Sequence, residues 1–342
     1  MYDKLTHMSQ TYVALYRKYR PQSFSDVVGQ EQAIELLTSS IKQNKISHAY
    51  LFCGGRGTGK TTVARIVAHE VGCNDEDIIE IDAASNRGID EIRELREAVR
   101  TAPFSSPYKV YIIDEAHMLT KEAANALLKT LEEPPRHVIF ILATTDPEKL
   151  PTTIVSRCQK VIFKQPDIDT LAERLLYVAK AEGGATITPE GARKIATHGK
   201  GSYRDALGIL EQILTGAEKV KEVADETIHK LLGIPQTEQV IALLEAVCTK
   251  DASGVIAAIK TLDQTDALRT YDELIEVVRT GLLVRVGESI ENKDIKRLAD
   301  TYPHTIGSKL VLELLERRHL LEVSHTHSWA AFEAILLGCV DM

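Results

Sequence analysis

The sequence predicts an α/β domain built on a parallel β-sheet, followed by two smaller all-helical domains. Three observations support this fold class. Short apolar runs alternate with helical patterns in the first half, the β pattern stops after Pro166, and longer helical patterns continue from about residue 235. Strands that alternate with helices are typical of a doubly wound α/β domain. A chain of 342 residues also exceeds what one hydrophobic core usually supports.

Five segments of the first half have the composition of β-strands. Several are too continuously apolar to have a solvated face, which indicates a parallel sheet with helices on both faces. An amphipathic helix is expected after the second strand, because Ile89, Ile92, Leu95 and Val99 recur at helical spacing. The predicted strands are residues 49–53, 78–82, 109–114, 138–145 and 159–164.

Helical patterns account for the rest of the chain. Thr188 followed by Pro189 predicts a helix start, with a capping residue before proline at the first helical position. The longer patterns cover residues 238–247, 267–286 and 309–321. We therefore predict an α/β domain over residues 1–165, a small helical domain over 166–232 and a terminal helical domain over 233–342.

Charge and cysteine content limit the possible functions. The net charge of −8 argues against a protein that coats DNA by bulk attraction, so any contact with nucleic acid should be local. The five cysteines are scattered without a CxxC pair, which favours reduced thiols over a disulfide framework or a zinc site. No signal-peptide pattern and no membrane-spanning apolar run is found, so a cytoplasmic location is expected.

A phosphate-binding motif follows the first predicted strand. Residues 54–61 read GGRGTGKT and match the pattern GxxxxGK[ST]. Glycines let backbone N–H groups face a phosphate, Lys60 offers a cation to the β- and γ-phosphates, and the Thr61 hydroxyl can bind Mg²⁺. A purely structural glycine-rich turn is the alternative, but the motif lies between a strand and a helix, as phosphate binding requires. The predicted contacts are Gly54, Gly57, Thr58, Gly59, Lys60, Thr61 and Thr62.

Polar residues follow the next strands at the same edge of the predicted sheet. Asp114 and Glu115 end an apolar strand, so one carboxylate can hold Mg²⁺ and the other can orient the attacking water. Thr145 ends the following strand, where ligands bind in such folds. Arg157 precedes the last strand, and an arginine there is by itself more often a surface residue.

Several segments resemble the clamp-loader ATPases of the AAA+ family, most closely the gamma/tau subunits of bacterial DNA polymerase III. The resemblance is dense to about residue 215 and general beyond it. It implies a P-loop AAA+ domain, an all-helical lid and an all-helical collar. The segments are residues 16–21, 24–30, 48–52, the phosphate loop, 114–117, 127–135, 143–146, 156–158 and 201–206.

The resemblance also implies roles for individual residues. Lys60 and Thr61 would hold phosphate and Mg²⁺, with Asp114 as a second metal ligand. Glu115 would orient water and Thr145 would be the first sensor. Arg204 would be a second sensor on the lid, and Arg157 a finger that completes the ATP site of a neighbouring subunit. The adenine pocket would be formed by Arg20, Pro21, Val27 and Val28.

The implied cofactors are ATP and Mg²⁺. The implied partners are the other subunits of a hetero-oligomeric ring, a sliding clamp and primer-template DNA, with no membrane. Candidate DNA contacts are residues 85–88 with Arg93, Arg96 and Arg100. An equally good interpretation pairs these arginines with Glu94, Glu97 and their neighbours on a solvated helix face.

The sequence departs from the family in one place. Gamma/tau proteins typically carry a four-cysteine zinc module between the phosphate-loop helix and the next strand, whereas here only Cys73 is present. One cysteine cannot form a tetrahedral zinc site, so we predict no structural zinc.

Two alternatives remain to this interpretation. The first is another AAA+ ATPase, such as a Holliday-junction motor or a protein-remodelling enzyme, although the sequence has no aromatic pore signature. The second is a nucleotide-binding but inactive scaffold, which the intact Lys60, Thr61, Asp114 and Glu115 disfavour.

Overall fold

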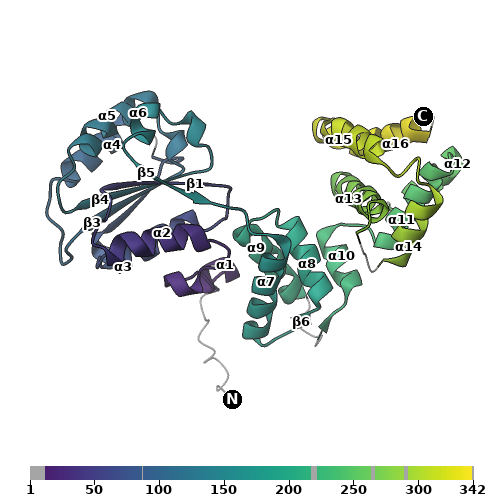
Figure 1. The fold of residues 1–342 in the computed structure, drawn as a ribbon, viewed down its shortest axis with the longest axis horizontal. Coiled ribbons are helices and arrows are strands. Elements are labelled where there is room, and N and C mark those ends of the chain that lie inside the picture. The colour runs from purple at the N-terminus through teal and green to yellow at the C-terminus, as the bar shows by residue number, and fades with distance from the viewer. Residues whose placement is uncertain (1–11, 87, 217–221, 263–265, 289–291, 341–342) are drawn as a thin grey trace, which may run out of the picture. The chain divides into compact units, whose positions relative to one another are not determined.

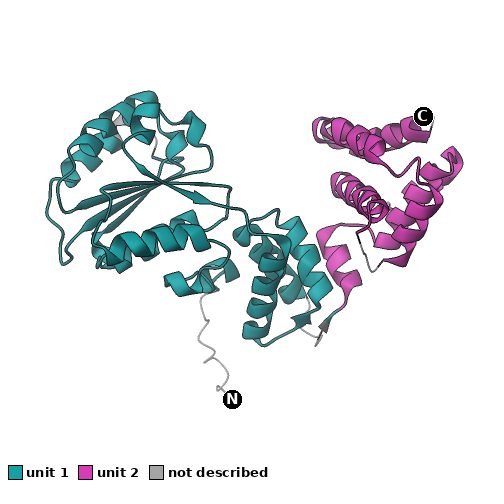
Figure 2. Cartoon of the chain, viewed as in Figure 1, with its two compact units in different colours: residues 1–223 teal, residues 224–342 magenta. Residues whose placement is uncertain are grey.

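The computed structural model describes residues 12–86, 88–216, 222–262, 266–288 and 292–340. It divides into two compact units, Met1–Val223 and Ala224–Met342 (Figure 2). The first unit has a hydrophobic core on each face of its sheet, and the second has a core of its own. The predicted boundary after residue 165 lies inside the first unit, so the α/β part and the helices that follow it form one compact body. The finer division into three domains stays a prediction.

In the described part of the chain, five parallel strands form the central sheet in the order β2-β3-β4-β1-β5. Because all strands run in one direction, their carboxyl ends meet at the same edge, where a ligand can be reached by several loops. Each predicted strand is confirmed to within one residue at either end. The strands are β1 (Ala49–Gly54), β2 (Ile78–Asp82), β3 (Lys109–Asp114), β4 (Val138–Thr144) and β5 (Gln159–Phe163).

Helices cover both faces of this sheet, as predicted (Figure 1). Alternate side chains of β1 point to opposite faces, so Leu51 is buried in one core and Phe52 in the other. Ile92, Leu95 and Val99 of the predicted amphipathic helix are buried in the first core. That core lies under α4 (Ile89–Ala98), α5 (Lys121–Glu132) and α6 (Thr152–Val155), and the second lies under α2 (Glu31–Lys42) and α3 (Lys60–Glu70).

The last part of the first unit, from Ile168 onward, is a small helical layer. Thr188 caps α8 (Pro189–His198) as predicted, because its Oγ1 accepts a hydrogen bond from the Gly191 amide at 2.9 Å. The layer also contains a short parallel strand pair, β6 (Thr186–Ile187) and β7 (Glu222–Val223), which the sequence did not predict. Strands of two residues are too short to show an alternating pattern. The helices are α7 (Ile168–Glu182), α8 (Pro189–His198) and α9 (Tyr203–Gly216), and α1 (Leu15–Lys18) packs against α9.

The second unit is helical throughout its described residues. Its core contains buried Leu243, Tyr271, Leu298 and Phe332. The helices are α10 (Asp225–Leu232), α11 (Thr237–Cys248), α12 (Ala252–Lys260), α13 (Ala267–Arg285), α14 (Lys293–Thr301), α15 (Ser308–Val323) and α16 (Ser328–Val340). No single described helix is long and apolar enough to cross a membrane, although the bent pair α10 and α11 meets the requirement by length and composition.

The connection between α3 and β2 occupies the position of the missing cysteine module. The Cys73 thiol donates a hydrogen bond to the Tyr108 carbonyl at 3.1 Å. Buried Asp77 accepts hydrogen bonds from the amides of Phe104, Ser105 and Ser106 at 2.6 to 3.0 Å. Burial by itself raises the pKa of Asp77, but these hydrogen bonds outweigh it and the pKa lies below its usual value. The described residues contain no group of three metal-ligating side chains.

Candidate nucleotide site

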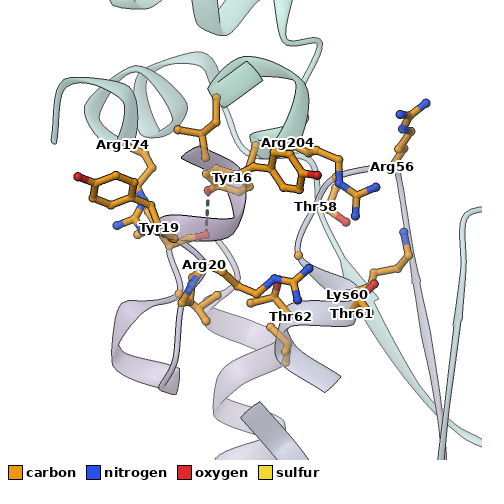
Figure 3. Close-up of a pocket in the computed structure, with 18 of the residues that line it drawn as sticks. Tyr16, Tyr19, Arg20, Arg56, Thr58, Lys60, Thr61, Thr62, Arg174 and Arg204 are labelled. Atoms are coloured by element: carbon orange, nitrogen blue, oxygen red, sulfur yellow. Dashed lines mark hydrogen bonds between the residues drawn. The ribbon is translucent and has the colours of Figure 1, made fainter. Parts of the chain in front are cut away.

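A pocket lies at the carboxyl edge of the sheet, beside the start of α3 (Figure 3). The predicted phosphate loop forms one wall of this pocket. The segment from α1 to α2 and the helices α7 and α9 form the other. The predicted residues among its lining are Arg20, Pro21, Val27, Val28, Gly57, Thr58, Gly59, Lys60, Thr61, Thr62, Asp114, Glu115 and Arg204.

The phosphate loop has the backbone geometry that its glycines allow. Gly57 and Gly59 have φ angles of 70° and 101°, in the left-handed region that favours glycine. A Cβ on Gly57 would lie only 2.0 Å from the Ser202 Oγ, so the loop passes very close to the helical layer. Gly59 is the N-cap of α3, whose N–H groups and partial positive charge favour an anion.

Lys60 lies in the loop with its ammonium group turned toward backbone carbonyls. Its Nζ donates hydrogen bonds to the carbonyls of Gly54 and Gly55 at 2.9 and 2.8 Å, and the residue is 6% exposed. Burial lowers the pKa of Lys60, whereas the nearby carboxylates of Glu115 and Asp114 act in the opposite direction. The loop therefore presents a desolvated cation to the pocket, which strengthens its attraction for phosphate.

Thr61 and Asp114 both line the pocket and are hydrogen-bonded to each other. The Thr61 hydroxyl donates to Asp114 Oδ2 at 2.7 Å, although the two residues are 53 positions apart in sequence. Both groups offer oxygen atoms, which are the ligands that Mg²⁺ prefers, and this ion usually takes only one or two protein ligands beside water and phosphate. The predicted pair of metal ligands therefore fits a magnesium nucleotide.

Glu115 and Thr145 lie at the next position along the sheet edge. Glu115 directly follows β3 with φ 48°, and its amide donates to Asp114 Oδ1 at 2.9 Å. Thr145 directly follows β4, and its Oγ1 lies 3.4 Å from Glu115 Oε2. The structure thus brings the predicted water-orienting acid and the predicted first sensor into contact.

The other wall of the pocket is held by residues that lie far apart in sequence. The Arg174 guanidinium donates to the Tyr19 carbonyl at 2.9 Å, and the Tyr203 hydroxyl donates to the Val28 carbonyl at 2.9 Å. The Tyr203 amide also donates to the Gly57 carbonyl at 3.0 Å. Arg204, the predicted second sensor, lies over the Tyr16 ring with its guanidinium carbon 5.8 Å from the ring centroid (Figure 3).

Arg20 and Arg157 occupy different environments. Arg20 lines the pocket, and burial lowers the pKa of its guanidinium. Arg157 lies outside the pocket lining, where it pairs with Glu132 and donates to the Thr153 carbonyl at 2.8 Å. Its side chain is 34% exposed. The predicted finger therefore does not reach the nucleotide pocket of its own chain.

Sequence reasoning missed several residues of this site. Tyr16 and Tyr19 lie in a segment that carried the family resemblance, but no role was assigned to them. Buried Gln30 joins the phosphate loop to the end of β5, because its amide nitrogen donates to the Thr58 carbonyl at 3.3 Å and to the Lys164 carbonyl at 2.7 Å. Its amide oxygen accepts from the Lys164 amide at 3.1 Å. Arg174 gave no signal, because its spacing on an amphipathic helix does not distinguish it from an ordinary surface arginine.

The candidate DNA contacts lie before, along and after α4. Arg87 falls outside the described residues. Arg93 and Arg100 are exposed and Arg96 is half-buried. These positions do not distinguish between a nucleic-acid contact and a solvated helix face, so their role stays a prediction.

Comparison with known proteins finds that this chain is similar to subunits of DNA polymerase III. A family model described as DNA polymerase III, delta subunit, matches residues 29–85 and 74–167. The DNA polymerase III subunit tau of Bacillus subtilis is 41% identical over 340 residues, covering 92% of this chain and 60% of that protein. The tau subunit of Escherichia coli is 34% identical over 350 residues, covering 96% and 52%. The chain thus spans about half to three fifths of the length of these relatives.

Solved structures show a likeness in fold. The RuvB Holliday junction branch migration motor of Thermotoga maritima has a TM-score of 0.53 at 20% identity, covering 67% of this chain and 79% of that chain. A mutant RuvB structure has a TM-score of 0.54 at 18% identity, covering 81% and 94%. At this identity the likeness shows a shared fold and carries no function, whereas the two relatives named above are subunits of DNA polymerase III.

Proposed function

We propose that this chain is a member of the DNA polymerase III gamma/tau family and an ATP-hydrolysing subunit of a machine that loads sliding clamps onto primed DNA. The observation that carries the proposal is the convergence of Lys60, Thr61 and Asp114 on one pocket. The sequence relationship, 34% to 41% over more than nine tenths of the chain, supports the same conclusion. We infer a cytoplasmic location from the same relationship.

In the proposed reaction, Lys60 and the amides of the phosphate loop bind the β- and γ-phosphates of ATP. Thr61 and Asp114 would hold Mg²⁺, which would supply positive charge beside the phosphate oxygens. Glu115 orients a water molecule whose oxygen forms a bond to the γ-phosphorus as the bridging bond to ADP breaks. ADP leaves with the electron pair of that bond, and the proton of the water passes to Glu115 or to the released phosphate.

ATP also acts as a conformational ligand in this proposal. Arg204 contacts the γ-phosphate from the lid helices α7 to α9, and Arg157 contacts the γ-phosphate in the site of a neighbouring subunit. A ligand biases a switch only through its different affinity for the two states. Hydrolysis removes the group that both arginines bind, so the assembly relaxes and releases the clamp.

The second unit has a surface suited to contacts with other subunits. Helix α15 exposes Leu312, Leu315 and Val323, with exposed fractions of 58%, 49% and 72%. Large apolar side chains on one helix favour burial against a partner. We propose that this unit is the collar of a hetero-oligomeric ring, while the first unit binds the clamp and the backbone of primer-template DNA.

The test of this proposal is ATP turnover by the assembled complex, with and without clamp and primed DNA. We expect both to stimulate turnover. Arg157→Ala should retain ATP binding in the isolated chain and lose roughly 10³-fold in stimulated turnover, the usual contribution of an arginine supplied in trans. Arg193→Ala is the matched control, because Arg193 is an exposed arginine paired with Asp169.

A mixing experiment separates a contribution in trans from one in cis. Lys60→Ala subunits keep Arg157 but lack the ammonium group for phosphate, and Arg157→Ala subunits have the opposite defect. If Arg157 acts on its neighbour, a mixture of the two should recover part of the turnover that neither shows alone. Normal turnover by Arg157→Ala, or no recovery in the mixture, contradicts the finger assignment.

A further inference from the structure

His117 contacts the carboxylate that the proposed reaction uses. It lies in η3 (Ala116–Met118), the short turn that directly follows Glu115. Its Nδ1 is 3.4 Å from Glu115 Oε2 and 3.0 Å from Thr144 Oγ1. The imidazole side chain is only 11% exposed, and Thr144 is fully buried. The contacts therefore lie in a protected position, where solvent does not weaken them strongly.

The backbone conformation of Glu115 is fixed, so the contacts of its side chain decide where the carboxylate points. Its φ of 48° is a left-handed conformation that residues other than glycine rarely adopt. Its carbonyl accepts a hydrogen bond from the Met118 amide at 2.8 Å. Only the side-chain torsions remain to be set, and His117 and Thr145 both contact Oε2. Neither of these two contacts is made to Oε1.

The hydrogen-bonding partners of His117 also indicate where its proton lies. The Thr144 hydroxyl oxygen accepts from the Asp146 amide at 3.0 Å, which fixes its position beside the imidazole. A bare Nδ1 can accept from the Thr144 hydroxyl, but it would direct a lone pair toward the Glu115 carboxylate. A protonated Nδ1 can donate to both the Thr144 oxygen and that carboxylate, and the proposal takes this Nδ1–H form.

We propose that His117 is a positioning residue for ATP hydrolysis. Its Nδ1–H holds Oε2 of Glu115, so that the carboxylate is oriented to place the attacking water. This inference rests on the proposed ATPase function and adds to it a residue outside the pocket lining. Because His117 does not line the pocket, it should affect the rate of hydrolysis and leave ATP affinity nearly unchanged.

The test compares two substitutions at this position. His117→Ala removes the donor, whereas His117→Asn places an amide N–H on the same side-chain atom position as Nδ1. We expect His117→Ala to lower single-turnover hydrolysis roughly 10- to 100-fold, the scale of a small misplacement of a catalytic group. We expect its Kd for ATP to stay within about twofold and His117→Asn to recover most of the rate. Met118→Ala, in the same turn and 40% exposed, is the control.

A double-mutant cycle identifies the group through which His117 acts. If it acts through Glu115, adding His117→Ala to Glu115→Gln should lower the residual rate no further. The inference is overturned by normal turnover of His117→Ala, by no gain from asparagine, or by an undiminished effect in the Glu115→Gln background. Should the alanine variant fail to fold, asparagine and glutamine are compared, because glutamine moves the amide away from the Nδ1 position. A wild-type chain that binds ATP without hydrolysing it overturns the proposed function itself.

Discussion

The two walls of the nucleotide pocket are built in different ways. The phosphate wall is a continuous loop, residues 54–61, supported by Asp114 from the end of β3. The opposite wall joins α1 and the segment between α1 and α2 to the lid helices α7 and α9, through hydrogen bonds between residues 155 to 196 positions apart. The first wall is formed by a local motif, and the second exists only while the helical layer stays docked.

This difference assigns different tasks to the two walls. Glycine conformations and a buried strand order the phosphate wall before ligand arrives, so it can supply most of the affinity. The opposite wall depends on a few polar contacts, each of which contributes only about 1 kcal/mol to stability. Such a wall can open and close, which is what a lid that responds to ATP requires.

Among the substitutions that test the difference between the two walls, we expect Lys60→Ala to have the largest effect on ATP affinity. Lys60→Ala removes the buried cation of the phosphate wall, and we expect ATP affinity to fall by roughly 100-fold, as for loss of a charge-assisted phosphate contact of about 3 kcal/mol. Titration of a fluorescent ATP analogue measures the effect. Lys42→Ala, at an exposed lysine in the last turn of α2, is the control. Near-normal affinity of Lys60→Ala would show that the loop is not the principal phosphate contact.

Gly57→Ala tests the place where the two walls touch. The new Cβ would meet the Ser202 Oγ at 2.0 Å and would force a side chain into φ 70°. We expect a loss of about 1 to 3 kcal/mol in unfolding free energy and a fall in ATP affinity of roughly tenfold. Thermal denaturation and nucleotide titration measure the two effects.

Gly208→Ala is the matched control for this change, because a Cβ on Gly208 of α9 would meet no atom within 4 Å. Replacing glycine in a helix interior usually stabilises by about 0.5 to 1 kcal/mol. Equal stability of the two alanine variants would contradict the close approach of loop and lid.

The smallest effect is expected at Glu211, which anchors the opposite wall from a distance. Its Oε1 accepts from the Leu15 amide at 3.1 Å and it also contacts Tyr12, whose pKa it raises through a hydrogen bond. Glu211→Gln weakens both contacts, so we expect ATP and ADP affinities to fall together by about two- to fourfold. An unchanged affinity for both nucleotides would show that α1 keeps its position without this anchor.

The parts of the site that could be predicted are those encoded by neighbouring residues. The five strands were located to within one residue, because continuous apolar runs between polar segments are a strong local pattern. The contact between Thr61 and Asp114 could be expected, because a phosphate loop and an acid at the end of a parallel strand share one sheet edge. Arg204 was assigned to the lid by resemblance, and the structure places it on the pocket.

The sequence by itself therefore determined the sheet, the phosphate loop and the acids at its edge. Only the tertiary structure decided that Arg174 donates to the Tyr19 carbonyl and that Tyr203 donates to the Val28 carbonyl. It also decided that His117 contacts Glu115. The physical reason is that a motif encodes its backbone conformation through residues adjacent in the chain. A contact between distant side chains depends instead on how helices pack and which polar groups then require a partner, and neither leaves a periodic trace in the sequence.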